Sequence, residues 1–212
     1  MTARRVVLWR HGRTAWNAES RFQGSTDVPL DEVGIAQAER AARDLATLAP
    51  ARIVASDLAR ARVTAEKLGE IVGLPVETDP DLRETYAGRW QGLVRDEIIA
   101  TDGVHFRRWL SGDDVPAGDG ETRTDVSVRV SAAVLRHADL LPPGGTLVVA
   151  SHGGAIRAGI GTLLHLPQEH WTALGGLVNC AWSVLEELAD GRWRLTEHNA
   201  RSLPEDVFGD ES

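Results

Sequence analysis

The chain has 212 residues, 42% of them hydrophobic and 25% charged, a composition typical of a single globular domain. Its 31 acidic residues outnumber its 23 basic ones, and the net charge of -8 argues against nucleic acid or an anionic membrane surface as the main partner. The chain has no apolar run of membrane-spanning length, no N-terminal stretch typical of a signal peptide and only one cysteine, Cys180, so we expect a cytoplasmic protein with a buried thiol.

The first half of the chain alternates between strand and helix patterns. The apolar run Arg5–Trp9 predicts a buried strand that leads directly into Arg10, His11 and Gly12. A polar loop then extends to Pro29. Beyond it the pattern predicts a helix capped by Asp31 and ending near Leu48, a strand at 52–55, the capping candidates Ser56 and Asp57, a helix at 58–72 and a strand at 76–78.

The second half begins with an irregular segment, residues 81–121, which is rich in glycine, aromatic and charged residues. We interpret it as an insertion with one or two short helices that covers a site. The pattern then predicts a helix at 121–141, a strand at 146–150, a helix at 155–164, and two strands at 178–185 and 193–197 joined by a hairpin at Asp190-Gly191.

This order of elements predicts a three-layer α/β/α sandwich, with a mostly parallel mixed sheet and helices on both faces. We expect one domain over residues 1–203, with 81–121 as a lid-like insertion and 204–212 as a loose acidic tail. In such sheets, ligands bind at the carboxyl ends of the strands. Two of the seven histidines, His11 and His152, follow predicted strands, and each precedes a glycine.

The surroundings of His11 favour phosphate chemistry. Arg10 supplies a fork of donors that matches phosphate oxygens, and Gly12 lets the backbone turn tightly or a ligand approach closely. The tripeptide Arg10-His11-Gly12 alone is only a weak indication of a phosphate site. For the other five histidines we expect surface or core positions: His105, His137, His165, His170 and His198.

Four separated motifs carry a resemblance to a known family. They are residues 10–17 (Arg-His-Gly-Arg-Thr-Ala-Trp-Asn) with 21–24, residues 56–61, residues 82–84 with 88–92, and residues 151–154 (Ser-His-Gly-Gly). In their order and type they resemble the histidine phosphatase superfamily, which includes cofactor-dependent phosphoglycerate mutase, and the resemblance extends from Arg10 to at least Asn199.

The resemblance implies a role for each matching residue. His11 is the nucleophile that becomes phosphohistidine, and Glu84 is the general acid. The phosphoryl oxygens and the substrate are bound by Arg10, Asn17, Gln23, Gly24, Arg60, His152 and Gly153, with Glu84 also in contact with substrate.

Physical chemistry makes these roles reasonable. A neutral imidazole is a nucleophile near pH 7, and two arginines with a histidine can neutralise phosphoryl oxygens as Mg²⁺ does elsewhere. No metal-ligand spacing occurs, so we expect no metal and no cofactor. Glu84 must carry a proton to act as an acid, which burial beneath the insertion would favour.

Some side chains leave alternatives open. Arg60 and Arg62 compete for one role, and we favour Arg60 because it shares a helix face with Thr64 and matches the family position. Trp9 is expected in the core. Trp90 and Trp109 fit the substrate entrance and the core equally well.

Three functions use such a pocket: a phosphatase, a phosphoglycerate mutase and a non-catalytic phosphate-binding module. The insertion contains no lysine, and the residues after Glu84 depart from the mutase pattern, which favours a phosphatase for a small phosphorylated metabolite. Stretches such as 90–93, 174–176 and 193–195 resemble those of the actinobacterial members of the family, which dephosphorylate glucosyl-3-phosphoglycerate. A homodimer, with the strand 178–185 at an edge contact, is also expected.

Overall fold

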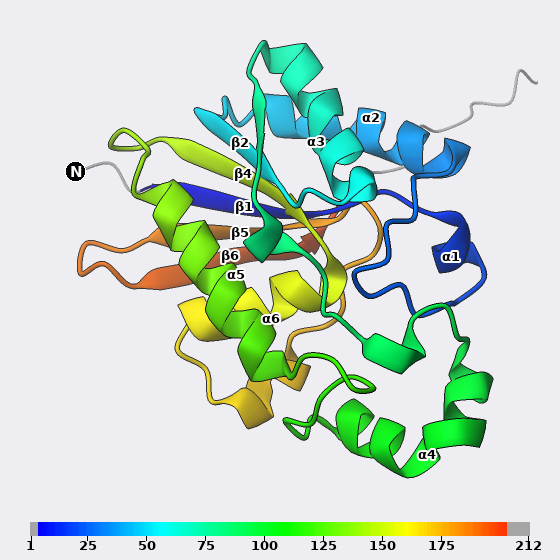
Figure 1. Cartoon of the computed structure of the whole chain (residues 1–212). Coiled ribbons are helices and arrows are strands. Elements are labelled where there is room, and N and C mark those ends of the chain that lie inside the picture. Colours follow the sequence, from blue (N-terminus) through cyan, green and yellow to red (C-terminus); the bar gives the residue numbers. More distant parts are fainter. Residues whose placement is uncertain (1–3, 203–212) are drawn as a thin grey trace, which may run out of the picture.

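The computed structural model describes residues 4–202, and a six-stranded mixed sheet lies at its centre (Figure 1). The strands are β1 (Arg5–Arg10), β2 (Arg52–Ala55), β3 (Val76–Thr78), β4 (Thr146–Ser151), β5 (Trp182–Glu187) and β6 (Trp193–Ala200), in the order β3-β2-β4-β1-β5-β6. The first four are mutually parallel, whereas β5 is antiparallel to both β1 and β6. The predicted fold class is confirmed. The expected tail, residues 204–212, lies outside the described residues.

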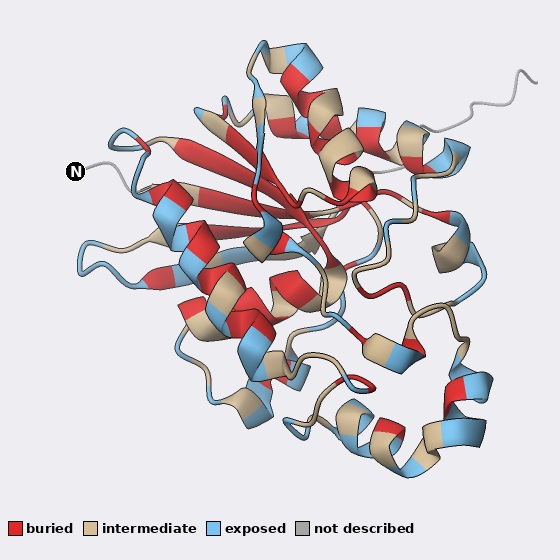
Figure 2. Ribbon diagram, viewed as in Figure 1, coloured by how far each residue is buried: buried red, intermediate tan, exposed pale blue. Residues whose placement is uncertain are grey.

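Helices cover both faces of the sheet. They are α2 (Glu32–Ala46) and α3 (Ala59–Val72) on one face, and α5 (Arg123–Ala138) and α6 (Gly153–Leu163) on the other (Figure 1). Successive residues of a strand point to opposite faces, so Val6 and Leu8 pack towards α5 and α6, while Val7 and Trp9 pack towards α2 and α3. The strands β1, β2, β4 and β5 are therefore buried along most of their length, whereas the edge strands β3 and β6 are more exposed (Figure 2). Helices α2, α3 and α5 each have a buried and an exposed side.

Carboxylate side chains accept hydrogen bonds from N–H groups in the first turns of α2, α3 and α6. Asp31 caps α2 as predicted, since its carboxylate accepts a hydrogen bond of 2.7 Å from the backbone N–H of Gly34. The helix predicted at 58–72 is confirmed as α3 to within one residue, but its predicted cap was wrong. Neither Ser56 nor Asp57 caps it through a side chain, and instead Asp27, from a distant loop, accepts from the N–H of Ala59 at 2.8 Å.

Two predicted boundaries near the carboxyl ends of strands were also wrong. Helix α6 starts at Gly153, two residues earlier than predicted, with His152 at its N-cap. Strand β5 starts at Trp182, four residues later than predicted, because Cys180 adopts a left-handed φ of 58° in a turn. Since β5 lies between β1 and β6, it is an interior strand and cannot supply the expected edge contact of a homodimer.

The 3₁₀ turn η1 (Pro80–Leu82) leads into residues 81–121, which also contain the 3₁₀ turn η2 (Gly88–Trp90) and α4 (Arg95–Ser111). Helix α4 consists of two short helices that meet at a kink, in agreement with the prediction. It bends at Asp102, whose φ and ψ of -147° and 33° are not helical. Trp90, Ile98 and Phe106 form a small separate core there, and most of α4 lies at the surface (Figure 2).

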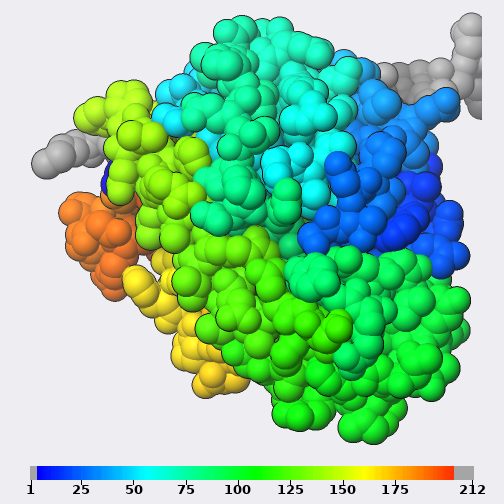
Figure 3. Space-filling view, in the orientation of Figure 1, coloured from blue at the N-terminus to red at the C-terminus, as the bar shows by residue number. Residues whose placement is uncertain are grey.

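This segment is joined to the loop after β1. Backbone hydrogen bonds connect Phe22 with Leu93 (2.9 Å) and Gly92 with Phe22 (2.8 Å). In the space-filling view, the green surface of 88–112 is continuous with the blue surface of the N-terminal loop (Figure 3). That loop, which the sequence indicated as irregular, also contains the single-turn helix α1 (Ala15–Ala18).

Candidate active site

The parallel pairing of β1 with β4 brings two histidines together. Arg10 and Ser151 are partners at the last position of the register, so His11 and His152 leave adjacent strands at the same edge. Their ring centroids lie 5.1 Å apart and the ring planes are tilted by 59°, so the rings are neighbours but not face to face. Both side chains are buried.

The hydrogen bond of His11 defines its tautomer. Nδ1 lies 2.7 Å from the carbonyl oxygen of Gly12, and since a carbonyl only accepts, Nδ1 carries the hydrogen and Nε2 has the lone pair. Burial, and then the positive charges of Arg60 and Arg10, hold the pKa of His11 well below its ordinary value of 6.5. His11 is therefore a neutral imidazole at pH 7 with a free nucleophilic nitrogen.

Gly12 allows a close approach between two backbone segments. A Cβ at this position would lie 2.3 Å from the carbonyl oxygen of Gly34, so only glycine allows the loop to approach the start of α2. Its N–H donates to the hydroxyl of Thr64 at 3.1 Å, which connects the loop to α3. Gly12 thus helps to fix the position of His11 through its packing and its hydrogen bond.

Arg60 is fully buried in the first turn of α3 and reaches three partners. Its guanidinium donates to the carbonyl oxygens of Gly24 (2.8 Å) and Thr26 (2.7 Å), and to Nδ1 of His152 (3.2 Å). Burial lowers the pKa of Arg60 to about 10, so the group keeps its charge at pH 7. Arg62 instead pairs with Glu66 on the surface, as expected.

The hydrogen bond from Arg60 also fixes the tautomer of His152. Because Nδ1 accepts, Nε2 carries the hydrogen, and this buried N–H has no hydrogen-bond partner within residues 4–202. Burial, and then Arg60, hold the pKa of His152 well below 6.5. Arg10 is in a similar situation: it donates through Nη1 to the carbonyl of Leu177, while its buried Nε is unpaired in the same part of the chain.

Glu84 lies at the N-terminus of α6. Its carboxylate accepts from the backbone N–H groups of Gly154 and Ala155, both at 3.0 Å, and of Thr85 at 2.9 Å. A Cβ on Gly154 would lie 2.6 Å from Oε1 of Glu84, so the close approach requires glycine there. The side chain is half-buried, so the expectation that the insertion encloses it was wrong.

The remaining predicted residues lie around the same site. Asn17 Oδ1 accepts from the N–H of Thr14 at 3.2 Å, which leaves its amide nitrogen available as a donor. Gln23 Oε1 accepts from the hydroxyl of Thr14 at 3.0 Å. The backbones of Gly24 and Gly153 form part of the wall of the cavity at this site.

These side chains line a cavity of about 310 Å³, the catalytic cavity. Of the predicted site residues, all but His152 are in its lining, and His152 lies beside His11. Eight further residues complete the lining: Arg21, Phe22, Thr85, Trp109, Gly154, Arg157, Gly176 and Leu177. Trp109 is thus at the entrance, whereas Trp90 is fully buried and makes no contact with this cavity.

Arg157 is the most informative of the residues that sequence reasoning missed. It lines the catalytic cavity, and no hydrogen bond or ion pair of its side chain occurs within residues 4–202. It lies near Arg123, whose guanidinium stacks 4.5 Å above the Trp109 ring. Burial, and then the like charge of Arg157, lower the pKa of Arg123 to about 10. The place of Arg157 one helical turn after Gly153 was the signal that could have revealed it.

Several other expectations concern residues away from the cavity. Burial raises the pKa of the Cys180 thiol to about 12, which fits the expected core position. None of the five other histidines, all within 4–202, lines the catalytic cavity. In that same range, no cluster of three or more His, Cys, Asp or Glu side chains is arranged to hold a metal ion, and no helix combines the length and apolar character needed to cross a bilayer.

Comparisons with known proteins agree with this geometry. The sequence profile of the histidine phosphatase superfamily (branch 1) matches residues 6–201. The glucosyl-3-phosphoglycerate phosphatase of Mycobacterium tuberculosis is 40% identical, over 94% of this chain and 96% of that protein. A probable phosphoglycerate mutase of Yersinia pestis is 35% identical, over 85% and 84%. A solved structure of mycobacterial glucosyl-3-phosphoglycerate phosphatase with VO3 has a TM-score of 0.88 and 42% identity, and covers 93% of this chain and all of that one (100%).

Proposed function

The chain belongs to the histidine phosphatase superfamily and is a phosphatase of it, and from this premise we propose that it hydrolyses phosphate monoesters through a covalent phosphohistidine at His11. Nε2 of His11 attacks phosphorus, so an N–P bond forms as the ester P–O bond breaks. The buried, neutral state of the imidazole supports this role, since the lone pair needs no prior loss of a proton.

One observation carries the proposal: buried donors without acceptors gather around His11. Within residues 4–202, five buried side-chain polar atoms lack a partner, and three of them belong to this site, on Arg10, His152 and Trp109. Such atoms are rare in folded proteins because each costs about 1–3 kcal/mol. Phosphoryl oxygens, which only accept, would satisfy the donors of Arg10 and His152 and disperse the charge on the transferring group.

We assign proton transfer to Glu84. It donates its proton to the leaving alkoxide oxygen in the first step. In the second step it takes a proton from the water that attacks phosphorus, and the N–P bond breaks as phosphate leaves. The backbone N–H groups at the start of α6 support this role because they hold the carboxyl group in one place at the cavity wall.

We further propose that the substrate carries a second anionic group, as glucosyl-3-phosphoglycerate does in its carboxylate. Arg157 supports this, since it is a cation in the cavity wall without a carboxylate partner in the described chain. Residues 81–121 would act as the lid over this end of the cavity, with Trp109 at its rim. Our prediction for the ligand remains a small phosphorylated metabolite. Our prediction for the location of the protein remains the reducing cytoplasm.

Two assays separate the three candidate functions. The protein is incubated with p-nitrophenyl phosphate in EDTA, and then with 3-phosphoglycerate and its bisphosphate primer. Hydrolysis in chelator supports a metal-independent phosphatase, isomerisation without phosphate release would instead indicate a mutase, and neither activity would leave a binding module. A panel of phosphorylated metabolites that includes glucosyl-3-phosphoglycerate then identifies the substrate.

The Arg157→Met variant tests the second anionic group. We expect kcat/KM for glucosyl-3-phosphoglycerate to fall by about 10- to 100-fold, the value of one hydrogen bond to a charged group, while p-nitrophenyl phosphate, which has no carboxylate, keeps its rate. Arg107→Met, which removes an exposed arginine of α4, is the matched control. An equal loss for both substrates in Arg157→Met would contradict the assignment.

A further inference from the structure

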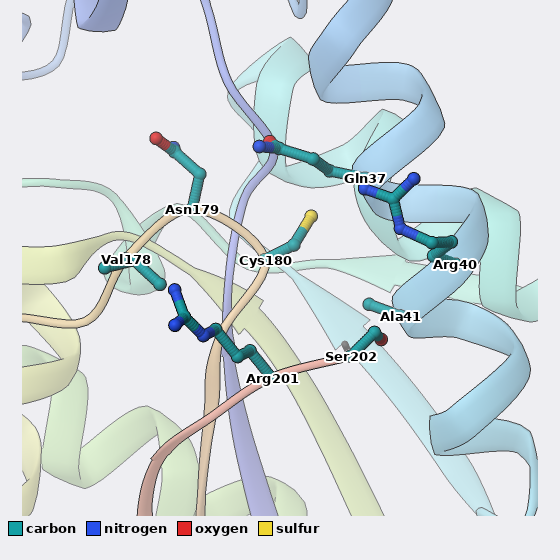
Figure 4. Close-up of a pocket in the computed structure, with 8 residues that line it drawn as sticks. All are labelled: Gln37, Arg40, Ala41, Val178, Asn179, Cys180, Arg201 and Ser202. Atoms are coloured by element: carbon teal, nitrogen blue, oxygen red, sulfur yellow. The ribbon is translucent and has the colours of Figure 1, made fainter. Parts of the chain in front are cut away.

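A second cavity, of about 340 Å³, lies between helix α2, the loop 178–180 and the segment that follows β6 (Figure 4). We name it the rear cavity. Its lining includes Gln37 and Arg40 from α2, Asn179 and Cys180 from the loop, and Arg201 and Ser202 from the last segment. It shares no lining residue with the catalytic cavity, so it is a separate site.

The charges in the rear cavity are all of one sign. Arg40 and Arg201 make no hydrogen bond or ion pair with any group of residues 4–202, and no carboxylate belongs to the lining. Cys180 is the remaining titratable group there, and its thiol stays neutral at pH 7 because burial raises its pKa to about 12. Other arginines of the described chain, such as Arg95 and Arg107, also lack an ion pair, but they lie exposed on α4, whereas Arg40 and Arg201 line one cavity together.

Gln37 adds a donor to the lining, whereas the amide nitrogen of Asn179 is already used by the catalytic loop and leaves only its oxygen. The side-chain oxygen of Gln37 is occupied by the N–H of Arg13 at 2.9 Å, so its amide nitrogen remains to donate. The hydroxyl of Ser202 donates to Asp44, which lies outside the lining. A ligand of this cavity must therefore bring negative charge and hydrogen-bond acceptors, which phosphate and carboxylate groups both supply.

The floor of the rear cavity also supports the catalytic loop. The side-chain amide of Asn179 donates to the carbonyl oxygens of His11 and Gly12 and to Oδ1 of Asn17, each at 3.2 Å. The backbone N–H of Cys180 donates to the same carbonyl oxygen of His11 at 3.2 Å. Any ligand that bridges Arg40 and Arg201 would thus lie against the loop that positions the nucleophile.

We propose that the rear cavity is a second anion-binding site for the phosphate or carboxylate group of a small metabolite, and that its occupancy raises the rate of the reaction at His11. A bound anion would hold α2 and the segment after β6 together over the loop 178–180. This would restrict the backbone of His11 and keep its ring ready for attack.

Binding stoichiometry tests the site independently of any enzymatic activity. With inorganic phosphate as the probe, we expect calorimetry to detect two sites per wild-type chain and one in the double variant Arg40→Met/Arg201→Met. The charge-matched control Arg95→Met/Arg107→Met, which changes two exposed arginines of α4, should keep both sites. One site in the wild-type protein, or two in Arg40→Met/Arg201→Met, would overturn the proposal.

Malonate then distinguishes the two anion chemistries and reports on the rate. Displacement of one equivalent of phosphate by malonate indicates a carboxylate site, and retention of both indicates a phosphate site; either result supports an anion site. We measure kcat at saturating p-nitrophenyl phosphate, since competition in the catalytic cavity changes KM alone. The anion that occupies the rear cavity should raise kcat at least about twofold in the wild type and not in Arg40→Met/Arg201→Met. An unchanged wild-type kcat would refute the effect on rate.

Discussion

The two arginines beside His11 have a double effect on that residue. Arg10 and Arg60 are the cations best placed to bind phosphoryl oxygens, and their charge, together with burial, also lowers the pKa of His11. A cation that attracts the substrate therefore also keeps the nucleophilic lone pair free of a proton. The same logic applies to His152, which Arg60 contacts directly.

His11→Ala tests the nucleophile. We expect kcat to fall on the order of 10³-fold or more, with a circular dichroism spectrum like that of the wild type because the residue lies in a loop after β1. Rapid quenching with ³²P-labelled substrate should trap label on the wild-type protein and none on His11→Ala. The exposed residue His170 provides the control, His170→Ala, which should retain label and rate. Trapped label in His11→Ala would place the phosphoryl group on another residue.

Glu84→Gln tests proton transfer. Alkyl phosphates have poor leaving groups that need a proton, so we expect their kcat to fall by about 10²- to 10⁴-fold. Aryl phosphates such as p-nitrophenyl phosphate leave without one and should lose much less. The ratio between the two substrates is the measurement, because the substitution also disturbs the hydrogen bond from the N–H of Gly154 and lowers both rates together. An unchanged ratio would rule out the acid role.

At the scale of the elements, the position of Glu84 depends on α5 and α6 together. The backbone N–H groups of Gly154 and Ala155 in α6 hold its carboxylate, and Arg129 of α5 donates to its carbonyl oxygen (3.1 Å) and to that of Arg83 (2.6 Å). Two helices that pack on the same face of the sheet thus fix one side chain at its edge.

The two glycines that begin α6 provide a matched pair of variants. In Gly154→Ala the new Cβ would lie 2.6 Å from the Glu84 carboxylate, so that group must move; in Gly153→Ala the nearest atom, Nε of Arg10, is 3.5 Å away, an ordinary contact. We expect kcat to fall by about 10- to 100-fold in Gly154→Ala, since a displacement near 1 Å has such an effect, and to fall less in Gly153→Ala, where no atom must move. Steady-state kinetics decide, and equal losses in the two variants would contradict the positioning role.

At the scale of the whole molecule, the buried histidines affect stability as well as catalysis. Burial first, and then Arg60, keep the pKa values of His11 and His152 well below 6.5, whereas in the unfolded chain they titrate near that value. Below pH 6.5 the unfolded state therefore binds more protons than the folded state. The free energy of unfolding is at its full value above pH 6.5 and decreases as the pH falls below it.

Urea unfolding at several pH values measures this effect. Each buried histidine should contribute a slope that grows as the pH falls below 6.5 and reaches up to about 1.4 kcal/mol per pH unit roughly one unit lower. We expect His152→Gln to flatten the dependence, while His170→Gln, which changes an exposed residue, leaves it as in the wild type. If His152→Gln retains the wild-type slope, protonation of this buried imidazole does not contribute to acid unfolding.

The sequence by itself determined the layered fold and most of the site. Strands and helices were predictable because their side-chain periods depend only on residues that are near in sequence. His11 and His152 each directly follow a strand, so parallel pairing of those two strands was enough to bring the rings together. The family membership was likewise predictable, since its motifs are short and contiguous. The start of β5 was harder to predict from the sequence, because the left-handed backbone of Cys180 is held by a hydrogen bond to the distant residue His11.

The tertiary structure alone decided which charged side chains remain unpaired and which hydrogens the histidines carry. Arg40, Arg157 and Arg201 resemble ordinary surface arginines in the sequence, and they become notable because distant segments form cavities around them while none of the three makes an ion pair within residues 4–202. The tautomers of His11 and His152 depend on partners that packing brings near, the carbonyl of Gly12 and the guanidinium of Arg60. Periodicity fixes where an element runs, whereas cavities and hydrogen-bond partners arise only when elements remote in the chain meet.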